Sequence, residues 1–310
     1  MGYVRKKFTV TKGVKAFKFL IDNFNCSMGE AQKWIDRKRV YLNGEVLEVK
    51  NFTVQGELEV IVFEPDSKGL KPIFETDYFA IFDKPSGVLI HPNRLSDEYS
   101  LNDEIKSLFG KDANVVHRID RETSGLVLVA KDKASEIELK RLFEKREIEK
   151  EYLALVYGEL DSEFTINANL KSALPSSKIR IKSHVVDGGQ KAITNIKPLK
   201  YLFDFDVTII KAKPFTGRTH QIRAHLFHVK HPIVGDMIYS QKEDDTDRFL
   251  NSNMSEDERL KLSGASRLML HADTLSFKYR GIEYNIKSKI DFERLIDEYY
   301  IGKQSEYNSE

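Results

Sequence analysis

The sequence predicts an α+β protein with a small N-terminal module and a larger C-terminal domain. Short apolar runs typical of strands recur between residues 79 and 286, and only a few stretches among them have helical spacing. The N-terminal residues have another pattern, in which two short helical stretches are followed by a hairpin signal. With 310 residues, of which 41% are hydrophobic, the chain can form one large core and one small one.

The N-terminal module is predicted to span residues 12–63. Apolar residues at helical spacing within 16–20 and within 31–35 indicate two short helices, and Asn-Gly at 43–44 indicates a tight hairpin. Residues 1–60 carry 11 Lys or Arg and 7 Asp or Glu, whereas the rest of the chain is slightly acidic. This basic surplus is typical of a module that meets RNA, although an ordinary solvated basic helix has the same composition.

A linker is predicted at residues 64–72, where Pro, Gly and Ser recur, and the larger domain is predicted at residues 73–302. A helix is expected over Ala134 to about Glu147. Gln241–Leu260 holds seven acids and three bases, so we expect an exposed loop or short polar helices that face away from RNA. The strands of this domain are expected at Phe79–Phe82, Leu126–Ala130, Tyr152–Val156, Val207–Ile210 and Ile282–Ile286.

One segment combines a carboxylate, two arginines and a turn. His117 to Gly125 has the sequence His-Arg-Ile-Asp-Arg-Glu-Thr-Ser-Gly, with Asp120 between Arg118 and Arg121, and a strand pattern follows it. Neighbouring guanidinium groups favour an ionised Asp, and a tight turn before a buried strand fixes its direction. Asp120 is therefore the first candidate for the chemistry. The segment alone fits an ion pair that only orders a loop equally well.

A second segment concentrates basic residues. Residues 211–231 hold five Lys or Arg, four His and no acid, although the whole chain has 49 basic and 48 acidic residues. The segment is therefore predicted to contact a polyanion. Its helical spacing places Arg218 and Thr219 at a helix start, where free N–H groups favour phosphate, and Arg223 deeper in the helix. The four histidines also allow a metal site, but no carboxylate or Cys accompanies them at the usual ligand spacing.

Together these segments resemble the RluA/RluD family of RNA pseudouridine synthases, and the resemblance covers most of the chain. The family pattern His-Arg-Leu-Asp-x-x-Thr-Ser-Gly matches residues 117–125, with Ile in the Leu position. Lys-Pro-x-Gly matches 84–87, Lys-x-Tyr-x-Ala-x-Val-x-Gly matches 150–158, and Leu-His-Ala matches 270–272. The long Gly-Arg-Thr-His-Gln-Ile-Arg element, with its Gly-Asp-x-x-Tyr end, matches 214–239. Five motifs in the family's order make the resemblance specific.

The resemblance implies a central, largely antiparallel bent sheet with the active cleft across its middle. It also implies catalytic roles: Asp120 matches the essential nucleophile, Arg223 the arginine that pairs with it, and Tyr152 the tyrosine that lies against the target uracil. Without the resemblance, Tyr152 would be taken as a core residue. The residues assigned to substrate binding are Arg118, which enters the space left by the flipped base, Leu270, which closes the pocket, and Arg218, Thr219, His220 and Gln221.

The implied reaction isomerises uridine to pseudouridine and needs no cofactor and no metal. The expected partner is structured RNA, above all large-subunit (23S) ribosomal RNA, with tRNA as the alternative target. The N-terminal module resembles the RNA-binding domain shared with ribosomal small-subunit protein S-four. His117, Thr123 and Ser124 are expected to hold the loop of Asp120 in place.

Two other classes of protein remain to be weighed. A non-catalytic RNA-binding protein would keep the basic segments, but it has no reason to hold Asp120 between Arg118 and Arg121. A hydrolase with an Asp nucleophile normally needs a second carboxylic acid nearby, and none stands out in these motifs. Release of free uracil would favour the hydrolase, and isomerisation without release would favour the synthase.

Composition sets the remaining expectations. Cys26 is the single cysteine, so an internal disulfide framework is excluded and a cytoplasmic location is expected. Cys26 itself is interpreted as a small buried packing residue. No apolar run approaches the ~18 residues of a membrane span. We therefore expect a monomer without an obligate protein partner and without a membrane segment.

Overall fold

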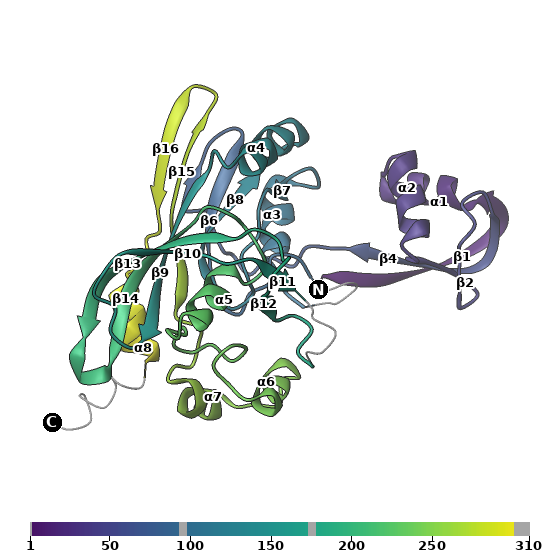
Figure 1. The fold of residues 1–310 in the computed structure, drawn as a ribbon. Coiled ribbons are helices and arrows are strands. Elements are labelled where there is room, and N and C mark those ends of the chain that lie inside the picture. The colour runs from purple at the N-terminus through teal and green to yellow at the C-terminus, as the bar shows by residue number, and fades with distance from the viewer. Residues whose placement is uncertain (1, 93–97, 173–177, 301–310) are drawn as a thin grey trace. The chain divides into compact units, whose positions relative to one another are not determined.

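The computed structural model describes residues 2–92, 98–172 and 178–300. The chain forms two compact units (Figure 1). One is built from the residues up to Gly69 together with His91–Ser107, and the other from Leu70–Ile90 together with the chain from Leu108 onward. The last two residues of the predicted catalytic domain, 301–302, lie outside the described residues.

The first unit contains a four-stranded sheet in the order β1-β4-β2-β3, with two helices packed on it. Both predicted helices are present, and Asn43 and Gly44 have the positive φ angles, 50° and 86°, that a tight hairpin turn requires. Cys26 is buried in the core. The elements of this unit are β1 (Tyr3–Lys15), α1 (Ala16–Phe24), α2 (Met28–Asp36), β2 (Val40–Leu42), β3 (Glu45–Val46) and β4 (Thr53–Phe63).

Strand β1 is an element that the sequence did not predict. It begins at Tyr3, before the predicted domain start at residue 12, and it pairs with β4 along most of its length. Apart from the buried Val10, its inward positions are only partly buried, and lysines or Arg5 occupy several outward positions. This charged composition weakens the alternating apolar pattern by which strands are found, and only the pairing with β4 determines the strand.

The segment after β4 has no helix or strand before β5 (Phe74–Glu75), and residues 64–69 are exposed. It is nevertheless held in place by helix α3 (Leu101–Phe109). The buried carboxylates of Asp103 and Glu104 accept hydrogen bonds from the backbone N–H groups of Asp66, at 3.1 Å, and Lys68, at 2.6 Å. Residues 66 and 68 of this exposed segment are therefore bonded to α3 within the first unit.

The second unit is built on a mixed sheet with the path β10-β13-β14-β9-β15-β8-β6-β5, on which β16 pairs with β15 and β7 with β8. Every strand pair in it is antiparallel except β15 with β8. The α+β class and the largely antiparallel sheet are thus confirmed. Its strands after β5 are β6 (Phe79–Lys84), β7 (Asn114–Val115), β8 (Ser124–Ala130), β9 (Glu149–Tyr157), β10 (Phe164–Asn167), β13 (Ile193–Leu202), β14 (Val207–Pro214), β15 (Leu270–Tyr279) and β16 (Ile282–Lys287).

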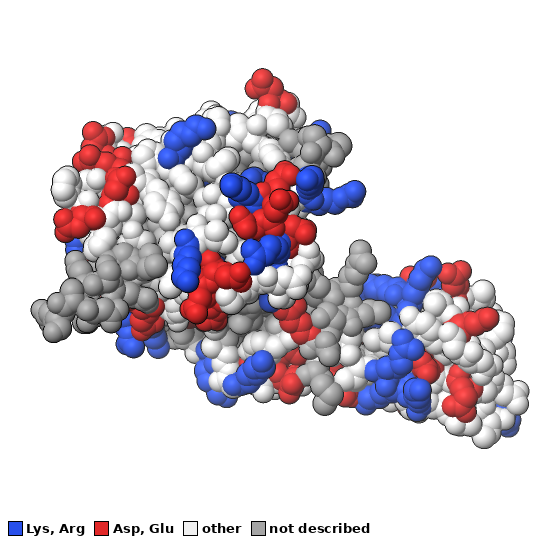
Figure 2. Space-filling view, turned by 90° about the horizontal axis from the view of Figure 1, so that it is seen from below, with Lys and Arg blue, Asp and Glu red and all other residues white. Residues whose placement is uncertain are grey.

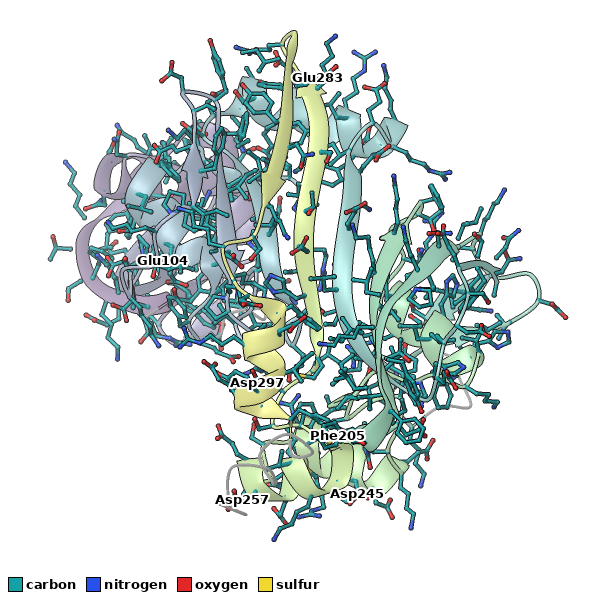
Figure 3. All side chains as sticks on the ribbon, turned by 90° about the vertical axis from the view of Figure 1, so that its left-hand side faces the viewer. Glu104, Phe205, Asp245, Asp257, Glu283 and Asp297 are labelled. Atoms are coloured by element: carbon teal, nitrogen blue, oxygen red, sulfur yellow. The ribbon has the colours of Figure 1, made fainter. Side chains whose placement is uncertain are left out.

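A short separate ribbon joins β11 (Leu170–Ser172) to β12 (Ser183–Val185), and a 3-10 turn, Phe203–Phe205, links β13 to β14. The predicted helix after residue 134 is α4 (Lys133–Lys145). The acidic segment forms short polar helices, marked in Figure 3 by Asp245 and Asp257, at the opposite end of the sheet from the β15–β16 turn at Glu283. The remaining helices are α5 (Gln221–His228), α6 (Glu243–Leu250), α7 (Glu256–Ser263) and α8 (Phe292–Tyr299).

Among the described residues, no helix is long and apolar enough to cross a membrane. The apolar side chains of the second unit instead form cores on the large sheet. One cluster packs around β9, β13 and β14 with α5 and α8, and another packs around β6, β8 and β15 with α4. The cores hold the central strands rigidly, and these strands carry the site described below.

The parallel contact between β8 and β15 depends on one glycine. Ser124 and Gly125 pair with His271 and Ala272, and Gly125 has a φ of 109°. A Cβ added to Gly125 would lie 2.2 Å from the carbonyl oxygen of Ala272. Both the backbone conformation and the close approach therefore require glycine. This contact fixes the end of the loop that carries Asp120.

Gly125→Ala is expected to lower the free energy of unfolding by about 3 kcal/mol or more, because the strands must separate to admit the methyl group. Gly281→Ala is the matched control: its φ is 85°, but nothing lies within 4 Å of an added Cβ, so only backbone strain of about 1 kcal/mol is expected. Urea unfolding of both variants measures the difference. Equal destabilisation would show that the strand contact does not constrain residue 125.

Candidate active site

One cleft of about 730 Å³ lies within the second unit and brings the predicted residues together. Its walls come from the loop before β8, the first part of β9, the end of β14 and the start of α5. All nine residues that the sequence singled out line it: Arg118, Asp120, Tyr152, Arg218, Thr219, His220, Gln221, Arg223 and Leu270.

The loop of Asp120 is held by the end of β6. The buried ammonium group of Lys84 donates hydrogen bonds of 2.8–2.9 Å to the carbonyls of Pro85, Val88 and Arg121. Ser86 donates to the carbonyl of Glu122, and the N–H of Gly87 donates to that of Arg121. Burial lowers the pKa of Lys84 to about 7, an effect that the nearby carboxylates Glu122 and Asp120 oppose. The Lys-Pro-x-Gly motif thus acts as a cradle for the catalytic loop.

Arg223 is the cation next to Asp120. Its Nη1 lies 3.3 Å from Oδ2 of Asp120, while its Nε and Nη2 donate to the two oxygens of Asp236 at 2.8 and 2.7 Å. The side chains of Arg223 and Asp236 are 3% and 0% exposed. The family resemblance had implied this partner, whereas the local sequence alone had pointed to Arg118 and Arg121. Arg121 donates through Nε to the carbonyl of Gly87.

Asp236 binds Nε and Nη2 of Arg223, the side of the guanidinium that does not contact Asp120. Burial by itself would raise the pKa of Asp236, but the charge and hydrogen bonds of Arg223 outweigh it and keep that pKa below its usual range. The backbone N–H groups of Ile238 and Tyr239 also donate to Oδ1 of Asp236. A bidentate pair with both charges buried fixes the plane of the guanidinium, so its free Nη1 edge faces Asp120. The sequence comparison had included Asp236 in a motif without giving it a role.

His220 completes the surroundings of Asp120. Its Nε2 lies 3.8 Å from Oδ2 of Asp120, and its backbone has a φ of 53° just before α5. Burial, reinforced by Arg223, lowers the pKa of His220 to about 4, so the ring is neutral at pH 7. Both contacts of Asp120 are made by Oδ2, and the side chain is 23% exposed. Within the described ranges, Oδ1 has no protein partner.

Strand register places Tyr152 at the floor of the cleft. Tyr152 pairs with Ala212 on one side and Ala272 on the other, and directly paired residues project to the same face. The two methyl groups leave room for the tyrosine ring. Burial and the charge of Asp120 raise the pKa of Tyr152, so its hydroxyl stays protonated at neutral pH. Leu270 pairs with Ala154, lies on the same face and is buried.

The other predicted residues divide into exposed and buried groups. Arg118 and Thr219 are exposed at the cleft, where RNA can reach them. Gln221 is buried, and its amide makes four protein hydrogen bonds: it accepts from Thr216 and from the N–H of Arg218, and donates to Ile193 and Thr194. These bonds use its donors and acceptors fully, so Gln221 braces the loop instead of contacting substrate.

The hydrogen bonds of the Gln221 side chain also explain why α5 begins later than the sequence predicted. The helix begins at Gln221, whereas the sequence had placed Arg218 and Thr219 at its start. The side chain of Gln221 ties the preceding turn to β13, and His220 takes the left-handed conformation that changes the chain direction. Arg218 lies in that turn and donates to the carbonyl of Lys191. The backbone N–H of Arg218 donates to the side chain of Gln221, so this group is not free to bind phosphate.

Polar residues behind the loop form a buried chain that the sequence did not reveal. Arg267 donates to Ser124, and the hydroxyl of Ser124 lies 2.8 Å from Nδ1 of His271. On the other side, Nε2 of His271 lies 2.8 Å from the hydroxyl of Ser288, which donates to Asp83. The residues come from four distant parts of the sequence, so only the fold brings them together.

The histidines do not gather around a metal. His225 bonds through its two ring nitrogens to Thr194 and to the carbonyl of Ala168, and His231 bonds to the carbonyl of Tyr157. In the part of the chain that the structure describes, no group of three His, Cys, Asp or Glu side chains could hold a metal ion. His117 stacks on Phe143, and its Nε2 accepts from the N–H of Leu128. Burial, and less so Lys150, lowers the pKa of His117 to about 3.

Comparisons with known proteins agree with this geometry. The family model for RNA pseudouridylate synthase matches residues 78–228. An uncharacterized RNA pseudouridine synthase of Helicobacter pylori (strain J99) is 37% identical over 93% of this chain and 96% of its own length. Ribosomal large subunit pseudouridine synthase D of Xanthomonas campestris pv. campestris is 31% identical over 81% of this chain and 77% of its own.

Two further proteins are similar over part of the chain. The mitochondrial tRNA pseudouridine(32) synthase of Saccharomyces cerevisiae is 33% identical over 68% of this chain and 47% of its own length. The solved structure of human RNA pseudouridylate synthase domain containing 1 is 26% identical, covers 76% of this chain and 91% of that one, and has a TM-score of 0.59.

The fold and the cleft are those of an enzyme that acts on uridine in RNA. The chain belongs to the family of RNA pseudouridine synthases. It is therefore an isomerase: the glycosidic bond of a uridine breaks, the uracil turns while it stays bound, and its carbon 5 joins the sugar.

Asp236→Asn is expected to lower the free energy of unfolding by about 3–5 kcal/mol, because it leaves the buried Arg223 without its charge partner. Turnover should fall as well, since the guanidinium edge that faces Asp120 loses its support. Chemical unfolding and initial rates of pseudouridine formation measure the two effects.

Glu138→Gln is the control for Asp236→Asn. Glu138 pairs with Arg280 at 3.0 Å, but both side chains are at least 40% exposed. An exposed pair contributes about 1 kcal/mol or less. If the two variants lost the same stability, the Arg223–Asp236 pair would not be the constraint that its burial indicates.

Proposed function

We propose that this enzyme modifies a uridine of large-subunit ribosomal RNA and that Asp120 is its nucleophile. The observation that carries the role of Asp120 is its position: one oxygen faces a guanidinium fixed by Asp236, and the other faces the open cleft. A carboxylate nucleophile must be held in one orientation with an oxygen exposed to the reacting carbon. Either the anomeric carbon of the sugar or carbon 6 of the base can be that carbon.

Tyr152 supports the same assignment from the floor of the cleft. Its ring offers a flat surface for the uracil, and its protonated hydroxyl can take part in moving the proton from carbon 5 once the new carbon-carbon bond has formed. Leu270 supplies an apolar contact beside it. These contacts suit a base that has left its helix.

Arg118 supports base flipping. Extruding a uridine from folded RNA costs a few kcal/mol, which contacts inside and beside the pocket must offset. Arg118 is exposed at the cleft, two residues before Asp120, and a guanidinium can stack on bases and bond to phosphate at once. We therefore propose that the side chain of Arg118 fills the space that the flipped uridine leaves in the RNA.

The N-terminal unit is proposed to bind RNA in the manner of the domain shared with ribosomal small-subunit protein S-four. Figure 2 shows several Lys and Arg side chains on the surface of this unit. Lys33 and Arg37 are exposed and stand one turn apart at the C-terminal end of α2. Two neighbouring cations on one helix end can contact consecutive phosphates.

Ribosomal RNA is favoured over tRNA by the extent of the similarity. The relatives named as ribosomal large subunit enzymes match 81% of this chain and 77% of their own length in the case of Xanthomonas campestris, whereas the yeast tRNA enzyme matches over less than half of its own. A tRNA uridine is the alternative target. Mapping pseudouridines in RNA from cells with and without the gene decides between them.

Asp120→Asn is expected to abolish pseudouridine formation, because the amide keeps the shape but cannot act as the nucleophile. RNA affinity should stay within a few-fold of wild type, since Asp120 adds no favourable charge toward phosphate. Purified wild-type and variant proteins are incubated with total RNA from cells that lack the gene, and the modified position is mapped. Activity within a few-fold of wild type would contradict the role of Asp120, and uracil release would indicate a hydrolase.

The double variant Lys33→Gln, Arg37→Gln is expected to weaken RNA binding and to make its dependence on salt shallower. For two lost phosphate contacts, the slope of log affinity against log salt should fall by about 1.4–1.8. The control is Lys278→Gln, an exposed lysine on β15. An unchanged salt slope in the double variant would contradict an RNA contact at this helix end.

A further inference from the structure

We propose that Lys150, together with Arg146, forms a binding site for one RNA phosphate next to the target uridine. The inference rests on the proposed function only in taking RNA as the substrate, and it is independent of which RNA is modified. It assigns a function to a cation of the cleft that the catalytic arrangement of Asp120, Arg223 and Tyr152 does not use.

Lys150 projects into the cleft from the same strand face as Tyr152. The two residues are two positions apart in β9, so both side chains lie on one face of the sheet, about 6.6 Å apart along the strand. The ammonium group also lies close to the loop before α5, since a Cβ added to Gly217 would be 3.8 Å from Nζ. The charge is therefore within reach of the phosphate beside a uridine whose base lies on Tyr152.

No anion of the protein satisfies this charge. Across the described ranges, Lys150 has neither an ion pair nor a hydrogen bond with a protein partner. The nearest carboxylate along the strand, Glu149, bonds to Lys213 at 2.6 Å, and Glu151 bonds to Lys211 at 2.7 Å. The acids on both sides of Lys150 are thus already neutralised by other lysines.

The surroundings of Lys150 add positive charge instead. Arg146, the residue that caps the end of α4, also lines the cleft, is exposed and has a left-handed φ of 61°. Burial first, and the nearby Arg146 second, lower the pKa of Lys150. Glu144 and Glu149 line the cleft as well, but among the described residues neither forms an ion pair with Lys150 or Arg146. Two cations that line one cleft without a carboxylate partner attract an anionic ligand. The RNA substrate brings such a group with every nucleotide.

A purely structural role of Lys150 would give a different result when the residue is replaced, because the protein would then lose stability. If Lys150 supported the fold, it would bond to carbonyls or carboxylates, as Lys84 does in its cradle. Without such partners, replacing Lys150 with glutamine removes a poorly solvated charge and should leave the melting temperature unchanged or raise it. A site kept for a ligand at the expense of stability is common in enzymes.

The test compares Lys150→Gln, Lys150→Arg and the control Lys278→Gln. Initial rates of pseudouridine formation are measured on total RNA from cells lacking the gene, at the position that the wild-type protein modifies, over a range of RNA and KCl concentrations. For Lys150→Gln we expect kcat/KM to fall about tenfold, mainly through KM. The slope of log kcat/KM against log salt should become shallower by about 0.7, as for one phosphate contact on a single strand.

Lys150→Arg should keep the salt slope of the wild-type protein, because it keeps the positive charge. Lys278→Gln should behave as wild type. An unchanged salt slope in Lys150→Gln, or a clear loss of thermal stability, would overturn the phosphate site and make Lys150 a structural residue. A wild-type protein that modifies tRNA and not ribosomal RNA would refute the proposed target alone, since the comparison of variants runs at whichever uridine is modified.

Discussion

The buried pair of Arg223 and Asp236 is the interaction on which the site depends. Removing two charges from water costs several kcal/mol for each ion, and only close bidentate geometry with further hydrogen bonds offsets this cost. Here both guanidinium bonds are 2.8 Å or shorter, and two backbone N–H groups satisfy the carboxylate as well. Arg223 therefore has one orientation. Its remaining edge meets Oδ2 of Asp120, a residue that lines the cleft.

The loop of Asp120 is held from several independent directions. The cradle of Lys84 binds its backbone, Gly125 fixes its end against β15, and Ser124 joins a buried polar chain that reaches Asp83. Arg259 of α7 adds an ion pair of 2.7 Å with Glu122. Helix α7, which belongs to the acidic segment that the sequence suggested only as a surface away from RNA, thus also supports the loop of Asp120. Rigidity of this kind is what an oriented nucleophile requires.

Charge is arranged differently on the two sides of the cleft. Near Asp120 the cation Arg223 is compensated by two carboxylates, and His220 is neutral. On the other side of the cleft, no carboxylate in the described part of the chain forms an ion pair with Lys150 or Arg146, and Glu149, which also lines the cleft, pairs with Lys213. In the roles proposed above, the first arrangement orients a reacting group, and the second attracts a polyanion. Such a division allows one cleft to bind RNA by its phosphates while the chemistry proceeds at a carboxylate that would otherwise repel them.

The sequence by itself determined the local elements and the family of the protein. Apolar periodicity predicted α1, α2, α4 and the central strands, because those patterns are set within a few residues. The motifs assigned candidate roles to Asp120, Tyr152 and Arg223, which line one cleft in the structure. What only the tertiary structure decided is which groups meet. Asp236, Lys84 and His271 lie far from Asp120 in sequence, and strand β1 gains its identity from pairing with β4. Gln221 was expected at the substrate, but its four protein bonds show that it braces the loop. Pairing across a sheet and compensation of buried charge depend on distances between remote segments, and no local pattern encodes them.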